Sequence, residues 1–173
     1  MSTLVLGGAR SGKTAYALRT AEAGRGGLVM IATAEALDAE MQARIARHRA
    51  DRGPRWRTLE APLDLVGALS EVGAGEITVV DCLTLWLSNL MHAERDLDLE
   101  TDRLLAALHG RDVLLVSNEV GLGIVPDNAL ARRFCDAAGR LNQRLAAAAD
   151  RVVFIAAGLP LVMKGAPEPA QRR

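Results

Sequence analysis

Residues 7–14 read Gly-Gly-Ala-Arg-Ser-Gly-Lys-Thr and match the phosphate-binding pattern G-x-x-x-x-G-K-[ST]. The apolar run Leu4-Val5-Leu6 comes directly before them, and a helical pattern begins at about Lys13. Glycines let backbone N–H groups converge on a phosphate, and the positive end of the helix points to the same place. Lys13 would reach the β and γ oxygens, while Thr14 would offer its hydroxyl to Mg²⁺. The alternative, a glycine-rich turn with a stray lysine, is disfavoured by this context, so we expect a nucleotide ligand.

Acidic residues follow two other apolar runs. Asp81 ends the run Ile77–Asp81, and a carboxylate in this place holds Mg²⁺, directly or through water, in many nucleotide-hydrolysing proteins. This pattern is common and gains weight only from the loop upstream. Glu119 follows the run Val113–Asn118 and opens a glycine-punctuated segment that ends at Pro126. Glu119 lies either in an ordinary turn or in a substrate-facing loop as a metal partner or base.

A histidine lies on an apolar helical stripe. The pattern over Ala36–Arg49 places Leu37, Met41 and Ile45 on one side of a helix, and His48 falls among them. A histidine in this place is either a hydrogen-bonded core residue or a functional group. Arginines surround it at positions 44, 47, 49 and 52. They either clamp phosphates and keep a nearby imidazole neutral, hence nucleophilic, or form a solvated helix end.

The elements that must position these residues are short apolar runs alternating with helical patterns. The expected strands are Leu4–Gly7, Leu28–Thr33, Ile77–Asp81, Val113–Asn118 and Val152–Ala157. The expected helices are Lys13–Ala23, Ala36–Arg49, Leu63–Val72, Thr84–His92, Leu99–Leu108 and Asn128–Ala148. Strands without polar alternation are typical of a parallel sheet buried on both faces. We therefore predict an α/β fold of the three-layer, RecA-like P-loop NTPase type, whose mainly parallel sheet is flanked by helices.

Length and composition limit the remaining possibilities. The chain has 173 residues, and we expect residues 1–164 to form one domain. We expect a mobile tail over residues 165–173, which contain two prolines and no apolar anchor. Lys plus Arg and Asp plus Glu balance at 21 each, which argues against a nucleic-acid partner. The sequence shows neither a signal-peptide pattern nor a run long enough to span a bilayer. We expect a cytoplasmic protein.

The chain resembles the bifunctional adenosylcobinamide kinase / adenosylcobinamide-phosphate guanylyltransferase family of cobalamin biosynthesis, over about residues 3–164. The phosphate-binding loop is shared by many kinases. Two other segments are far more specific, Arg44-Ile45-x-x-His48-Arg49 and Ser117-Asn-Glu-Val-Gly-Leu-Gly-Ile-Val-Pro126. Further matching segments are Ile31–Thr33, Asp38–Met41, Trp56–Thr58 with Glu60, Asp81–Leu87, Gly139–Gln143 and Ala157–Pro160.

The resemblance implies two reactions with ATP or GTP as substrates and Mg²⁺ as cofactor. A nucleoside triphosphate phosphorylates adenosylcobinamide, and GTP then gives GMP to a histidine, which passes it to adenosylcobinamide phosphate. The family's guanylylated histidine aligns with His48, and Arg47 stands where some members have a second histidine. The nucleotide contacts carried over are Gly7, Gly8, Ala9, Arg10, Ser11, Gly12, Lys13, Thr14, Ala32, Thr33, Ala34, Arg49, Ala50, Asp51, Arg52, Glu60 and Asp81. The resemblance also implies a homotrimer, with the acceptor site between subunits.

Two other functions also use a phosphate-binding loop. A regulatory GTP switch needs a guanine-selective Asn-Lys-x-Asp segment, and the sequence has none. A simple P-loop kinase for a small metabolite is the alternative enzyme, and it would leave His48 without a role.

Overall fold

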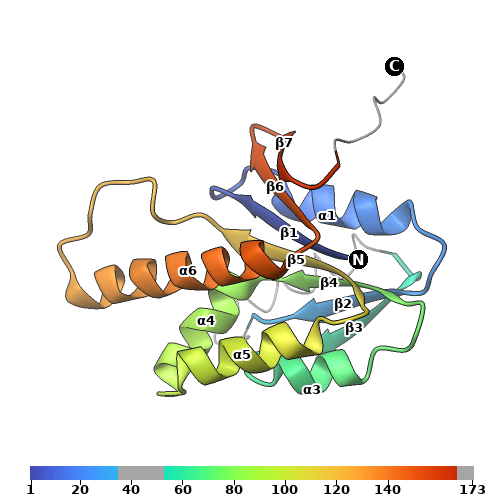
Figure 1. Cartoon of the computed structure of the whole chain (residues 1–173), viewed down its shortest axis with the longest axis horizontal. Coiled ribbons are helices and arrows are strands. Elements are labelled where there is room, and N and C mark those ends of the chain that lie inside the picture. Colours follow the sequence, from blue (N-terminus) through green and yellow to red (C-terminus); the bar gives the residue numbers. More distant parts are fainter. Residues whose placement is uncertain (35–52, 167–173) are drawn as a thin grey trace.

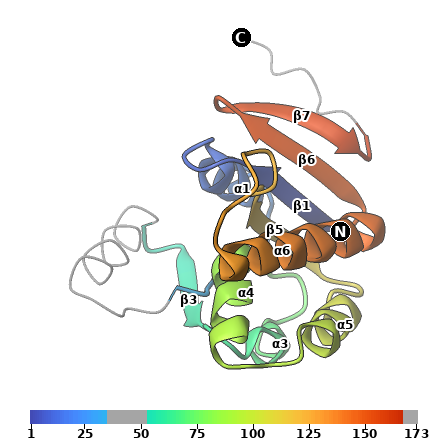
Figure 2. The ribbon, with the colours of Figure 1, turned by 90° about the vertical axis from the view of Figure 1, so that its left-hand side faces the viewer.

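The computed structural model of the chain describes residues 1–34 and 53–166, which form a seven-stranded sheet between two layers of helices (Figure 1). The strand order is β3-β2-β4-β5-β1-β6-β7, and all neighbours are parallel except β6 and β7. The strands are β1 (Ser2–Gly7), β2 (Leu28–Ala32), β3 (Trp56–Glu60), β4 (Ile77–Asp81), β5 (Asp112–Asn118), β6 (Arg151–Ala156) and β7 (Leu159–Lys164). The carboxyl ends of the parallel strands therefore meet at one edge, which faces the viewer in Figure 2.

Helices cover the sheet unequally. One face carries only α1 (Lys13–Glu22) among the described helices. The other face carries α3 (Leu65–Ser70), α4 (Leu83–His92), α5 (Leu97–Ala107) and α6 (Ala129–Ala148). Side-chain caps begin three of these helices. Asp64 accepts from the Gly67 N–H at the start of α3, Asp96 from the N–H groups of Asp98 and Leu99, and Asn128 from those of Leu130 and Ala131.

The two faces of the sheet form two buried clusters that are mostly aliphatic. Leu4, Leu115 and Trp86 belong to the cluster under α3 to α6, whereas Val5 and Tyr16 belong to the cluster under α1. Successive residues of β1 enter opposite clusters, as alternating side chains of a strand must. This double burial explains why the central strands read as continuous apolar runs.

The predicted fold class is confirmed, and so are the five predicted strands, which differ by two residues or fewer at their ends. Strands β3 and β7 were not predicted. Both lie at edges of the sheet, and within the described residues each is bonded to one neighbouring strand only. β3 reads Trp-Arg-Thr-Leu-Glu with an exposed arginine, and β7 carries Pro160, which a central strand would exclude. The predicted helix Ala36–Arg49 and residues 167–173 of the predicted tail lie outside the described residues.

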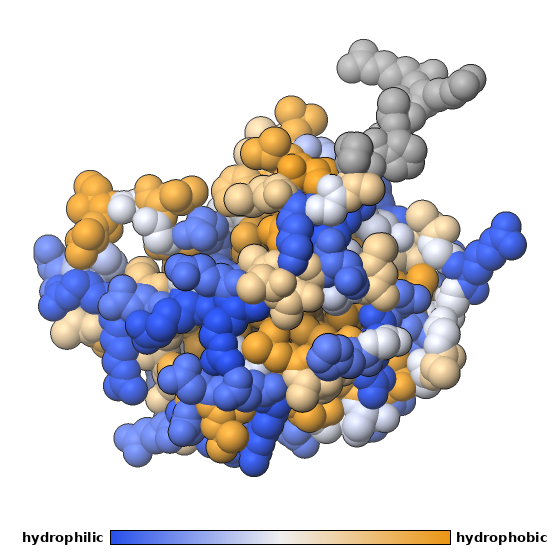
Figure 3. All heavy atoms as spheres, in the orientation of Figure 1, coloured by the Kyte–Doolittle hydropathy of each residue, from blue (hydrophilic) through white to orange (hydrophobic). Residues whose placement is uncertain are grey.

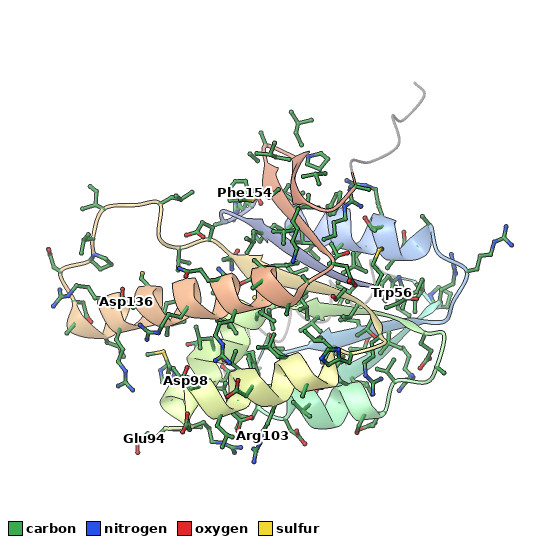
Figure 4. All side chains as sticks on the ribbon, in the orientation of Figure 1. Trp56, Glu94, Asp98, Arg103, Asp136 and Phe154 are labelled. Carbon is green, nitrogen blue, oxygen red and sulfur yellow. The ribbon has the colours of Figure 1, made fainter. Side chains whose placement is uncertain are left out.

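Trp56 joins β3 to the layer above the sheet (Figure 4). Its side chain is 9% exposed, belongs to the cluster under α1, and donates through Nε1 to Glu22 Oε1 at 3.1 Å. This contact holds β3 against α1 even though most other side chains of β3 are polar.

Within residues 1–34 and 53–166, no helix is long and apolar enough to cross a membrane.

Two leucines of α5 test how much this packing contributes to stability. Leu104 is fully buried, whereas Leu99 is 46% exposed on the same helix. We expect Leu104→Ala to lower the free energy of unfolding by about 2–5 kcal/mol, through lost apolar burial and the cavity left behind. The matched control Leu99→Ala should stay within about 0.5 kcal/mol. Urea unfolding followed by circular dichroism measures both, and equal effects would contradict the packing described.

Candidate nucleotide-binding and active site

The loop between β1 and α1 is held by backbone hydrogen bonds from two neighbouring segments. The N–H of Glu119, after β5, donates to Gly7 O at 3.0 Å, and the N–H of Gly158, in the β6–β7 turn, donates to Ser11 O at 2.9 Å. Gly7 has φ +153°, and a Cβ there would lie 2.4 Å from Ile155 O. Only glycine fits this position, so the first glycine of the motif is required by the strand packing as well as by the ligand.

The Ser11 hydroxyl is buried inside this loop, and among the described residues its oxygen lacks a hydrogen-bond partner. Leaving a buried hydroxyl unsatisfied costs free energy, so such groups in native proteins usually have a ligand or water as partner. A phosphate oxygen is a suitable partner because it accepts a hydrogen bond from the hydroxyl. The loop therefore has the polar character that a phosphate requires.

Lys13 brings a positive charge into the same loop. Its side chain is 7% exposed, and Nζ donates to Gly8 O at 2.6 Å. Burial lowers the pKa of Lys13 from its ordinary value, and the charge of nearby Asp81 opposes this effect. An anionic ligand strongly stabilises an ammonium group that has lost much of its hydration.

Thr14 and Asp81 connect the loop to the end of β4. Thr14 Oγ1 donates to Asp81 Oδ2 at 2.9 Å. This contact brings together two residues 67 positions apart, as the sequence analysis expected of a shared metal site. A hydroxyl and a carboxylate are hard oxygen donors of the kind that Mg²⁺ prefers, so the pair fits this ion.

Thr33 at the end of β2 links that strand to β4. Its hydroxyl donates to Cys82 O at 2.7 Å and accepts from Cys82 N at 2.9 Å. Asn89 from α4 donates to Thr33 O at 2.9 Å and to Pro62 O at 3.0 Å. Thr33 therefore holds the carboxyl ends of β2 and β4 together, and Ala32, Thr33 and Ala34 lie at the same edge as the phosphate-binding loop. Glu60 ends β3 at this edge and is exposed.

Glu119 follows the strand that lies between the strand ending at Asp81 and the strand ending at Gly7. Strand β5 is inserted between β4, which ends at Asp81, and β1, which ends at Gly7. Glu119 follows β5, and its Oε1 accepts from the Gly121 N–H at 2.6 Å. The carboxylate thus forms a turn contact, which is the first of the two sequence interpretations, while the backbone N–H of Glu119 contacts the phosphate-binding loop. Its chemical role stays a prediction.

Two positioning residues, Asn89 and Thr84, were missed by the sequence analysis. Asn89 holds Thr33 as described above, and Thr84 Oγ1 accepts from the Asn118 N–H at 2.7 Å, which ties α4 to the end of β5. Both residues lie in α4. Polar residues within a helix carry no local signal of such distant partners. The predicted residues His48, Arg49, Ala50, Asp51 and Arg52 lie outside the described residues.

Replacing Lys13 separates its effect on folding stability from its effect on GTP binding. Because the pKa of Lys13 is lowered in the folded protein, the protonated form disfavours folding at neutral pH, and this penalty falls as pH rises through the lowered value. We expect Lys13→Met to bind GTP roughly 10–100-fold more weakly, through loss of a charged hydrogen bond. The nucleotide-free variant should have a Tm at or above that of the parent at pH 7. Calorimetric titration and thermal unfolding measure the two quantities, and unchanged GTP affinity would contradict the assignment.

Comparisons with known proteins show the family of the chain. The family model described as cobinamide kinase / cobinamide phosphate guanyltransferase matches residues 3–163. The chain is 51% identical to the bifunctional adenosylcobalamin biosynthesis protein CobP of Pseudomonas aeruginosa, over 96% of this chain and 99% of that protein. It is 41% identical to the corresponding protein CobU of Salmonella typhimurium, over 95% of this chain and 100% of that one.

A solved structure supports the fold alone. The flagellar accessory protein FlaH of Methanocaldococcus jannaschii superposes with a TM-score of 0.54 at 12% identity, covering 95% of this chain and 78% of that chain. The near full-length sequence matches carry the assignment instead. The chain belongs to the cobinamide kinase / cobinamide phosphate guanyltransferase family.

Proposed function

We propose that this chain phosphorylates adenosylcobinamide with ATP or GTP and then transfers GMP from GTP to adenosylcobinamide phosphate, giving adenosylcobinamide-GDP. The observation that carries the proposal is the phosphate-binding loop, where the buried Lys13 ammonium and the buried Ser11 hydroxyl both suit a phosphate. Family membership supplies the acceptor.

In the kinase step, the acceptor's hydroxyl oxygen forms a bond to the γ-phosphorus, and the bond from that phosphorus to the β–γ bridging oxygen breaks. The departing nucleoside diphosphate takes the bond electrons, and a base takes the hydroxyl proton. Backbone N–H groups of the loop and Lys13 hold the phosphates in line and neutralise their charge. Thr14 and Asp81 would hold Mg²⁺, which supplies further charge neutralisation when bound. Glu119 would serve as the base or as a further metal partner.

In the guanylyl step, a neutral nitrogen of His48 attacks the α-phosphorus of GTP and pyrophosphate leaves. A phosphate oxygen of the acceptor then attacks the same phosphorus, and the histidine is released. Two displacements through a phosphoramidate let one nucleotide pocket serve a large acceptor that arrives later. The simple small-metabolite kinase remains the alternative, and it predicts no covalent nucleotide.

Covalent labelling tests the guanylyl step. We expect incubation with GTP labelled at the α-phosphate to leave label on the denatured protein, removed by acid and stable to base, because a phosphoramidate has this lability. His48→Ala should abolish the label. His92→Ala is the matched control, since His92 is exposed at the end of α4 and its Nδ1 contacts Ser88 O. Absence of label from the parent protein, or its persistence in His48→Ala, would refute the covalent intermediate and favour the simple kinase.

We also propose that three copies assemble through strand β7. Leu159, Leu161 and Met163 alternate along this edge strand and are 71%, 63% and 62% exposed. Alternate residues of a strand share one face, so these three side chains form an apolar stripe beside the open edge of the sheet. Figure 3 shows apolar side chains gathered over β6 and β7. Stripes of this kind on a sheet edge are typical of protein interfaces and otherwise promote aggregation.

Sedimentation equilibrium tests the assembly. We expect the parent protein to have the mass of a trimer and Leu161→Asp to shift it toward the monomer, because a carboxylate in the stripe would lose its hydration on association. Leu99→Asp, at an exposed position of α5, is the control and should leave the mass unchanged. A monomeric parent protein would exclude the trimer. A trimeric Leu161→Asp variant would show that the subunits meet elsewhere than at β7.

A further inference from the structure

The segment between β5 and α6 exposes large apolar side chains at the edge of the sheet that holds the nucleotide site. Leu122, Ile124 and Val125 are 81%, 97% and 72% exposed. The chain between Asn118 and Ala129 contains neither helix nor strand, and it projects beyond the sheet in both ribbon views (Figure 1, Figure 2). In the space-filling view, apolar atoms gather at the upper left, where this segment projects in the ribbon (Figure 3). We call residues 121–126 the apolar loop.

The apolar loop has fixed ends. At its start, the Glu119 N–H donates to Gly7 O at 3.0 Å, and Glu119 Oε1 accepts from the Gly121 N–H. At its end, the Arg132 guanidinium donates to the carbonyl oxygens of Pro126 and Asp127 at 2.9 and 2.6 Å. Polar contacts therefore hold both ends in place while the apolar side chains between them point away from the core. This arrangement presents a surface, because burying those side chains would require a partner.

The position of the apolar loop identifies the partner. It begins two residues after Glu119, whose N–H donates to Gly7 O in the phosphate-binding loop, so a molecule lying on it would be near the nucleotide phosphates. In the proposed reaction, the acceptor must bring a hydroxyl to that phosphate while its much larger macrocycle stays outside the nucleotide pocket. A corrin macrocycle has a periphery rich in methyl groups, which branched aliphatic side chains can cover. Gly121 and Gly123 give the backbone the freedom to follow a curved ligand.

We propose that the apolar loop binds the macrocycle of the cobinamide acceptor, with Leu122, Ile124 and Val125 as its contact residues. The inference rests on the proposed function. A second copy of the chain is the other possible occupant. The stripe on β7 already provides a surface for that contact, and a copy seated on the apolar loop would stand where the acceptor must enter. The apolar loop thus sets the affinity for the acceptor and leaves the GTP partial reaction unaffected.

The test combines three polar replacements with three measurements. We expect the Leu122→Ser, Ile124→Ser, Val125→Ser triple variant to raise the KM for adenosylcobinamide at least 10-fold, from apolar area left in water. Labelling by GTP alone should stay within about twofold, which also reports correct folding, and the sedimentation mass should be unchanged. Ile124→Leu should restore most of the affinity lost in Ile124→Ser. Leu99→Ser is the control for an exposed leucine elsewhere.

Each other outcome decides against the inference. An unchanged KM for adenosylcobinamide in the triple variant would show that the macrocycle binds elsewhere. A change in sedimentation mass accompanying the change in KM would assign the apolar loop to a second copy. If the parent protein labels with GTP but neither binds nor phosphorylates adenosylcobinamide, the proposed acceptor is wrong and the inference falls with it. Failure of the proposed function is thereby seen in the parent protein, whereas failure of the inference is seen only in the variants.

Discussion

The carbonyl oxygen of Ile155 lies 2.4 Å from the point that a Cβ atom of Gly7 would occupy, so β1 and β6 meet at this height only around a glycine. The Glu119 N–H after β5 and the Gly158 N–H after β6 donate to two carbonyl oxygens of the phosphate-binding loop. The loop is thus positioned by backbone contacts with the segments on both sides of β1. Its own N–H groups and the end of α1 are left to face a ligand, as anion binding requires.

A loop positioned in this way can bury groups that would otherwise stay in water. Lys13 is held under the loop with a lowered pKa, and the Ser11 hydroxyl is buried without a protein partner within the described part of the chain. Both destabilise the nucleotide-free protein, and the aliphatic packing beneath the sheet offsets this cost. A phosphate bound in this loop would reverse it, because the anion would accept from the hydroxyl and pair with the ammonium. The stabilisation on binding would therefore be larger than contacts to exposed groups would give.

The sequence predicts the centre of the fold better than its edges. Central strands buried on both faces must be apolar throughout, so β1, β2, β4, β5 and β6 can be read from composition. Edge strands escape this constraint, which is why β3 and β7 carry polar residues or a proline and were missed. The neighbours Gly7, Asp81 and Glu119 follow from the rule that ligands collect at strand ends. The roles of Asn89 and Thr84 do not, because a helix sequence carries no signal of which distant strand end its polar side chains will reach.

The two exposed apolar surfaces differ in ways that favour different occupants. The stripe on β7 is regular, lies on a strand, and has unpaired edge geometry beside it, all of which match a flat protein surface. The apolar loop is irregular and flanked by glycines, which suits a compact ligand of fixed shape. Both are joined to the phosphate-binding loop through one backbone hydrogen bond each, from Gly158 before β7 and from Glu119 before the apolar loop. The two proposed contacts, with a second copy and with the acceptor, would therefore lie near opposite ends of the phosphate-binding loop, one beside Ser11 and the other beside Gly7.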